Sequence, residues 1–120
     1  VHGWTYQEVV EEVLDYMAFA QCEDHSYYKS RGGWGYGPNQ IVSADNSVSG
    51  YAALGIGYAK VMGASIPQMI IDELAYWVVS IQDPTGFSYY RPGPSYHVHG
   101  DLMLKTGNLL YEKGLLGLPF

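Results

Sequence analysis

Two short clusters in this sequence hold side chains of the types that bind metals. Residues 22–25 read Cys-Glu-Asp-His, and residues 97–101 read His-Val-His-Gly-Asp. Imidazole, thiolate and carboxylate groups are the zinc ligands of proteins, and a stable site collects three or four of them. The second cluster offers two histidines two residues apart, a spacing that also arises by chance. Capping of a helix or stacking on Tyr96 accounts for these histidines equally well.

Motifs for other common chemistries are missing. The sequence has no Gly-x-Ser-x-Gly elbow for Ser-His-Asp hydrolysis. The glycine-rich stretch at residues 33–37 lacks the lysine and the preceding strand of a phosphate-binding loop. The single cysteine, Cys22, excludes an internal disulfide and a zinc site built from several cysteines of this chain. We expect it to be a buried, unreactive thiol.

Length and composition indicate one folded domain without affinity for polyanions. The 120 residues suffice for one hydrophobic core and are too few for two, and 48% of them are hydrophobic. The net charge of −6 excludes the basic surface of a protein that binds nucleic acid or an anionic membrane. No run approaches the roughly 18 apolar residues of a membrane span. We therefore expect no nucleic-acid partner and no membrane span.

Capping signals and apolar periodicity predict helices, and hence an all-α fold. Thr5-x-x-Glu8 is a capping box ahead of an i, i+3/i+4 apolar stripe that runs to Met17. Ser65-x-x-Gln68 repeats the same device ahead of the apolar run at residues 70–81.

Two further helices are predicted at residues 45–62 and 101–113. Asp45 or Ser43 suits the N-cap of the former, and Gly63 suits its C-terminal end. Gly114 is expected to end the latter. The segments at residues 32–39 and 84–94 are rich in glycine, proline and asparagine, which predicts loops.

The chain also reads as two copies of one helix-loop-helix unit. Residues 9–14 match residues 70–75 in class at every position, and the same offset of 61 pairs Gln21 with Gln82. A glycine-aromatic turn follows each glutamine with an offset of 53, which pairs Trp34 with Phe87 and leaves eight extra residues in the first copy. The sequence therefore predicts one domain or domain fragment over residues 1–120, made of repeats at about 5–63 and 64–117.

This repeat resembles that of the prenyltransferase and squalene-cyclase family. Gln82-Asp83-Pro84-Thr85-Gly86-Phe87 is similar to the family's "QW" motif, which ties a helix end to the next turn. The resemblance implies an α/α toroid of the prenyltransferase/terpene-cyclase kind, of which this chain holds two helical hairpins. Within the family the chain looks most like uncharacterised archaeal and bacterial repeat proteins, which implies an extracellular or cell-surface location.

The cyclase chemistry of that family lacks its residues here. Class II cyclases protonate an alkene with an Asp-x-Asp-Asp run, in which neighbouring carboxylates keep one aspartic acid protonated. The matching residues 43–46 read Ser-Ala-Asp-Asn and retain only Asp45. Because a lone carboxylate at a helix N-terminus is stabilised as the anion, Asp45 is interpreted as a helix cap.

The transferase chemistry of the family is matched only in part. The resemblance places Asp45 near the first zinc ligand and His99 within a residue of the last. Ser47 occupies the position of the cysteine ligand, and a neutral hydroxyl binds zinc far more weakly than a thiolate. We expect no cofactor, with zinc at Asp45 and His99 as the alternative.

Aromatic residues in the loops are the candidates for ligand binding. They are Tyr27, Tyr28, Trp34, Tyr36, Tyr89 and Tyr96. Either these rings pack over the hairpin ends, or they form a stacking platform for a sugar, peptide or isoprenoid. Packing is favoured because Trp34 and Phe87 occupy equivalent repeat positions.

The leading interpretation is a non-catalytic structural or binding segment of a toroid. Its partners would be further repeats of a longer parent chain, or other copies of this chain, because a repeat buries its apolar face against neighbours. One alternative is part of a zinc-dependent prenyltransferase-like enzyme with a degenerate metal site. Another is a carbohydrate-active or carbohydrate-binding toroid, which needs two carboxylates in one cavity. The carboxylates available for that role are Glu23, Asp24, Asp45 and Asp101.

Overall fold

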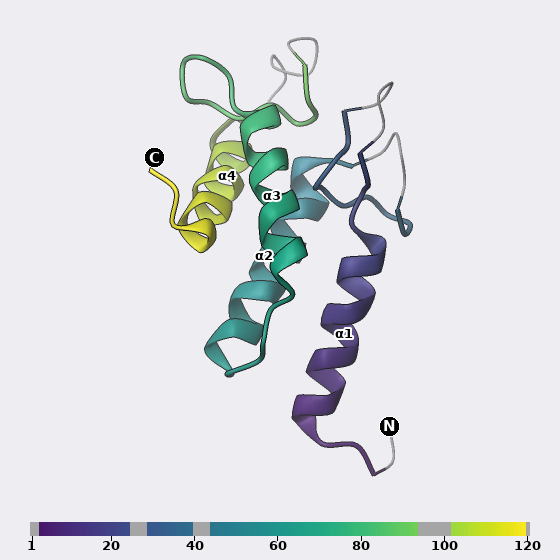
Figure 1. Ribbon diagram of the computed structural model, residues 1–120. Coiled ribbons are helices and arrows are strands. Elements are labelled where there is room, and N and C mark those ends of the chain that lie inside the picture. The colour runs from purple at the N-terminus through teal and green to yellow at the C-terminus, as the bar shows by residue number, and fades with distance from the viewer. Residues whose placement is uncertain (1–2, 25–28, 40–43, 94–101, 120) are drawn as a thin grey trace.

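Four helices make up the regular structure of the chain. The computed structural model describes residues 3–24, 29–39, 44–93 and 102–119. The helices are α1 (Tyr6–Ala20), α2 (Asn46–Val61), α3 (Gln68–Ile81) and α4 (Leu102–Leu116) (Figure 1). The described residues contain no strand beyond an isolated bridge between Gln82 and Ser88, so the predicted all-α class is confirmed. None of the helices in these ranges is long and apolar enough to cross a membrane.

The helices pack around α2 and α3, and α1 lies at one edge (Figure 1). The most extensive helix-to-helix contact joins α2 to α4, α3 also packs on α4, and α1 contacts both α2 and α3. The core is built mainly from fully buried side chains of three helices: Ile56, Ile70, Leu74, Trp77, Ile81 and Leu109. Helix α1 adds only Leu14 and Ala20 to the buried set, so most of its surface faces away from the core.

Local capping explains where α1 and α2 begin. Thr5 and Glu8 form the predicted capping box, with both reciprocal hydrogen bonds present at 2.8 and 3.1 Å. Asp45 is the N-cap of α2, as predicted, and accepts a hydrogen bond of 3.0 Å from the backbone N–H of Val48. Gly63, with φ +87°, follows the end of α2 and supplies the left-handed conformation that ends it.

Two predicted helix boundaries are wrong. Ser65 does not cap α3, because the helix begins two residues later, with Pro67 as N-cap and no side-chain cap. The Gln68 side chain instead donates to Asp72, one turn along the helix. Helix α4 continues past Gly114 to Leu116, and the turn with positive φ comes at Gly117. Glycine adopts helical backbone angles at a modest cost in free energy, so Gly114 alone does not end a helix.

The loops that follow α1 and α3 make matching hydrogen bonds. In each loop, the side chain of the glutamine after the helix donates to the carbonyl of a glycine. The backbone N–H of the residue after the glutamine donates to the carbonyl of the residue after that glycine. The backbone N–H of the residue after that acceptor donates to a hydroxyl group on the helix that follows the loop. The donors and acceptors are Gln21–Gly32, Cys22–Gly33 and Trp34–Ser49 in the first loop, and Gln82–Gly86, Asp83–Phe87 and Ser88–Thr106 in the second.

This correspondence differs by one residue from the alignment predicted from sequence. Gly32 and Gly86 share a positive φ, +83° and +96°, and occupy the same place in their loops. Trp34 therefore corresponds to Ser88 rather than to Phe87. Ten residues separate Gln21 from Gly32 and three separate Gln82 from Gly86, so the first loop is longer by seven residues rather than eight.

Two glycines let the first loop lie directly on α3. A Cβ added at Gly32 would overlap the backbone carbonyl of Glu73, and one added at Gly33 would lie 2.6 Å from Cε3 of the Trp77 ring. The Gln21 side chain fixes the same contact, because its amide donates both to Gly32 and to the carbonyl of Ile70, at 2.9 and 3.2 Å. Gly86, in contrast, has open space around it.

We predict that Gly32→Ala destabilises the protein more than Gly86→Ala does. Both substitutions place a Cβ on a left-handed residue, which costs about 1–2 kcal/mol. Only Gly32→Ala also forces the loop off α3, an overpacking cost of about 1–3 kcal/mol more. Urea unfolding of both variants measures the difference. Equal losses of unfolding free energy would show that the loop does not rest on α3.

Candidate functional site

The start of α2 is a polar region with several hydrogen bonds. Asp45 is buried, and its Oδ1 accepts from the Ser47 hydroxyl at 2.6 Å as well as from Val48. Its backbone N–H donates to the carbonyl of Trp34 at 3.2 Å. The Ser47 hydroxyl also lies 3.4 Å from that of Tyr90. Oδ1 of Asp45 thus serves as the helix cap expected from the sequence.

Asn46, next to it, ties α2 to both the second loop and α4. Its buried side-chain amide donates to the hydroxyl of Ser88 and to the carbonyl of Lys105, each at 2.8 Å. Its backbone N–H donates to Tyr90, and its carbonyl accepts from the Asn108 amide at 3.3 Å. The sequence does not predict this role, because the partners of the Asn46 side chain lie more than forty residues away along the chain.

A groove runs between α2 and α4 beside this polar region. It has a volume of about 400 Å³ and is lined by Ser47, Gly50, Tyr51, Leu54, Leu104, Asn108 and Tyr111. Gly50 brings the two helices close, since a Cβ there would lie 2.7 Å from Cγ of Asn108. The walls are mainly apolar, with a few hydroxyl groups and one amide, a composition typical of sites for small organic ligands.

The residues that line this groove on α2 are not among the predicted site residues. Tyr51 and Leu54 lie three residues apart on α2, opposite the buried Ala53 and Ile56. Helix α2 has apolar residues on two faces, and this pattern is the sequence signal for these groove residues. A helix that packs on one core needs only one apolar stripe.

The predicted loop aromatics lie in different environments. Trp34 is buried, and its indole N–H donates to the carbonyl of Met17 at 2.9 Å. Tyr89 is half-buried and packs against the core. Tyr36 is exposed. The other three candidates, Tyr27, Tyr28 and Tyr96, lie outside the described residues. The three described rings therefore differ in their exposure to solvent.

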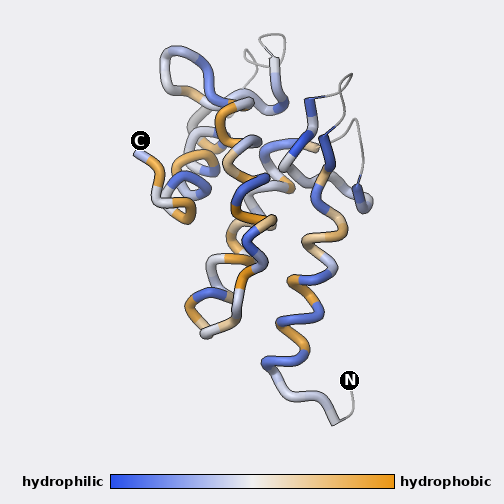
Figure 2. Tube along the Cα trace, viewed as in Figure 1, coloured by the Kyte–Doolittle hydropathy of each residue, from blue (hydrophilic) through white to orange (hydrophobic). Residues whose placement is uncertain are grey.

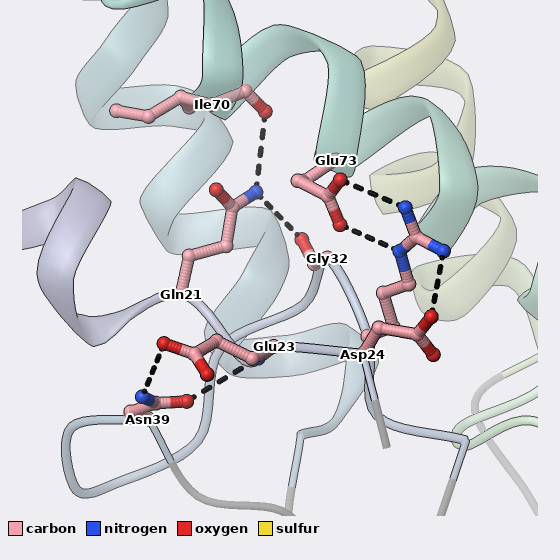
Figure 3. A network of polar contacts seen from close by, with 8 residues as sticks. Gln21, Glu23, Asp24, Gly32, Asn39, Ile70 and Glu73 are labelled. Atoms are coloured by element: carbon pink, nitrogen blue, oxygen red, sulfur yellow. Dashed lines mark hydrogen bonds and ion pairs between the residues drawn. The ribbon is translucent and has the colours of Figure 1, made fainter. Parts of the chain in front are cut away.

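The predicted metal and carboxylate residues that the structure describes form no metal site. Among residues 3–24, 29–39, 44–93 and 102–119, no three His, Cys, Asp or Glu side chains are placed to hold a metal ion. His99 and Asp101 lie outside these ranges. Glu23 accepts from Asn39 and Asp24 pairs with Arg31, in the network of Figure 3. Cys22 is buried, as predicted.

Helix α4 places a carboxyl group in the core. Glu112 is fully buried, and neither of its oxygens has a hydrogen-bond partner among the residues that the structure describes. Burial away from water disfavours the charged form and raises the pKa of Glu112 from 4.5 to about 8. The side chain is therefore predominantly protonated at neutral pH.

Comparison with protein-family models, with curated proteins and with solved structures gave no match. Function must therefore be argued from the residues and their geometry.

We predict that the protein loses stability as the pH rises from about 4.5 to about 8, and that Glu112→Gln removes part of this loss. Glu112 ionises in the unfolded chain above pH 4.5 but stays protonated in the fold up to about pH 8. Folding then binds a proton, so the unfolding free energy falls by up to about 1.4 kcal/mol per pH unit in that window.

Urea unfolding between pH 4 and pH 9 measures this dependence. The exposed Glu11 provides the matched control, and Glu11→Gln should leave the slope unchanged. Parallel pH profiles for the wild type and Glu112→Gln would contradict the assignment.

Proposed function

We propose that the chain is a non-catalytic structural or binding segment of an α/α toroid of the prenyltransferase/squalene-cyclase kind, built from two copies of one helical hairpin. The observation that carries the proposal is the matched set of three hydrogen bonds in the loops after α1 and α3. Independent loops have no reason to repeat a glutamine-to-glycine bond, a neighbouring backbone bond and a bond to a helix hydroxyl in the same order.

The packing of alternate helices supports the same proposal. Helix α1 contacts α3, the first helix of the next hairpin, and α2 contacts α4, the second helix of the next hairpin. Stacked helical hairpins make this pattern, since each helix lies beside its own counterpart. In a toroid such stacking produces two layers, with one helix of every hairpin in each.

The exposed apolar surface of α1 supports a role in association. Five of its large side chains are exposed, namely Tyr6, Val9, Val13, Tyr16 and Phe19. Figure 2 shows hydrophobic residues alternating with hydrophilic ones along α1. Large contiguous apolar patches are rare on monomers and mark interaction sites. The groove between α2 and α4 supports a binding role on a separate surface, where an apolar ligand would contact Tyr51, Leu54 and Tyr111.

We predict that the chain self-associates in solution through α1. Burial of the exposed stripe removes apolar side chains from water, at about 25 cal/mol for each Å². Val13→Asp introduces a charge into that stripe and should shift the protein to monomer in sedimentation velocity runs. Val61→Asp makes the same change at an exposed valine at the end of α2 and should leave association unchanged. A wild-type chain that stays monomeric at high concentration would contradict the proposal.

We predict that the purified chain holds no stoichiometric zinc. Asp45 Oδ1 is engaged by Ser47 and Val48, and a serine stands where a thiolate ligand is needed. Elemental analysis followed by zinc titration is the test, with Asp45→Asn chosen because asparagine retains the N-cap. Stoichiometric zinc that is lost in Asp45→Asn and in His99→Ala would instead support the zinc-dependent transferase.

A further inference from the structure

We propose that one face of α1 docks a further helical hairpin, whose loop carries arginine, glycine and glycine at the positions of Arg31, Gly32 and Gly33. This face is called here the α1 face and consists of Val9, Glu12, Val13 and Tyr16. The inference rests on the proposed function, because it takes the two hairpins of this chain as copies of one unit. It adds the surface and the loop chemistry by which a third hairpin would be recognised.

The contact between the first loop and α3 is the template. Ile70, Leu74 and Trp77 of α3 are each 0% exposed. The glycines at 32 and 33 lie against the backbone of Glu73 and the ring of Trp77. The Gln21 amide reaches Ile70, and Glu73 lies beside it on the same helix (Figure 3).

Arg31 adds an ion pair to this contact between the first loop and α3. Its Nε and Nη2 donate to the two carboxylate oxygens of Glu73 at 2.7 and 3.0 Å, a bidentate pair. Its guanidinium carbon also lies 3.6 Å from the centre of the Tyr76 ring. Bidentate arginine–carboxylate pairing fixes orientation as well as adding energy, so the loop has one register on the helix.

Helix α1 carries a similar surface that is exposed, with Asp15 at the position of Tyr76. The offset of 61 that relates α1 to α3 pairs Val9 with Ile70, Glu12 with Glu73, Val13 with Leu74 and Tyr16 with Trp77. The three apolar members of the α1 face are 37%, 52% and 57% exposed, whereas their counterparts are fully buried. Within the described chain, Glu12 takes part in no ion pair. The apolar side chains and the carboxylate that accept the first loop are thus present a second time.

The second loop of this chain does not fit the α1 face. At the positions of Arg31, Gly32 and Gly33 it has Thr85, Gly86 and Phe87. Threonine carries no charge for Glu12, and the Phe87 side chain would occupy the space that Gly33 leaves for a large ring. The fitting partner is therefore a hairpin with the chemistry of the first loop, and not the second hairpin of another copy.

A tandem protein tests the pairing. Residues 3–67 are placed ahead of residues 7–120, because Gln7 is the counterpart of Gln68 and the natural connection between hairpins is thereby kept. A thiol probe is introduced as Val13→Cys in the second copy, and its rate of modification by dithionitrobenzoate is measured. The same substitution in the unmodified chain, diluted until sedimentation shows a monomer, gives the reference rate. The buried thiols of Cys22 report on folding, since they must stay unreactive.

We expect the tandem protein to slow modification at Val13→Cys by about tenfold or more, because a docked hairpin must open before the reagent enters. Glu11→Cys, on the side of α1 that corresponds to the exposed Asp72, should react at one rate in both proteins. Adding Glu12→Lys to the second copy should restore reactivity at Val13→Cys. Adding Glu11→Lys should not.

With the Cys22 thiols unreactive throughout, equal rates at Val13→Cys in the tandem protein and the single chain would overturn the inference, as would equal effects of Glu12→Lys and Glu11→Lys. Sedimentation of the unmodified chain tests the proposed function separately. If that chain associates through α1 while the tandem protein leaves Val13→Cys reactive, the Arg-Gly-Gly pairing is wrong and the proposed function stands.

Discussion

The structure depends on one backbone contact, that of the loop at Gly32 and Gly33 with helix α3. The loop approaches so closely that neither residue has room for a Cβ. The Gln21 amide bridges the loop and Ile70, so the end of α1, the loop and the start of α3 form one connected unit. Trp34 follows these glycines, and its carbonyl accepts a hydrogen bond from the backbone N–H of Asp45. This bond connects the loop to the start of α2.

Polar groups at the start of α2 extend this unit to the rest of the molecule. Asn46 is buried and bonds to the second loop and to α4, so its amide holds together segments from both hairpins. The N–H groups of that amide are both paired, and because unpaired buried donors are expensive, these bonds hold α4 against α2. At Gly50, beside the groove, the missing side chain lets Asn108 of α4 approach α2.

The features that could be predicted from the sequence are those determined by interactions between residues close together in the chain. The helices follow from apolar spacing, and the starts of α1 and α2 follow from capping side chains within three residues of the cap. The loop register predicted from the sequence is wrong by one residue, because Trp34 and Phe87 agree in class while backbone conformation equates Gly32 with Gly86. The sequence did not predict the groove, the role of Asn46 or the buried Glu112, since each depends on which helix faces meet. That choice is made by contacts between residues far apart in the chain.

The two edges of the molecule present different side chains, so the proposed association would join unlike surfaces. The edge at α1 repeats the apolar residues and the carboxylate that α3 offers to the first loop. The opposite edge carries a loop in which Phe87 is exposed and Gln82 accepts from Lys113 of its own hairpin. Identical edges would favour symmetric pairs, whereas unlike edges favour head-to-tail contacts between unlike surfaces. The proposed association would therefore place one kind of neighbour at α1 and a different kind at the second loop.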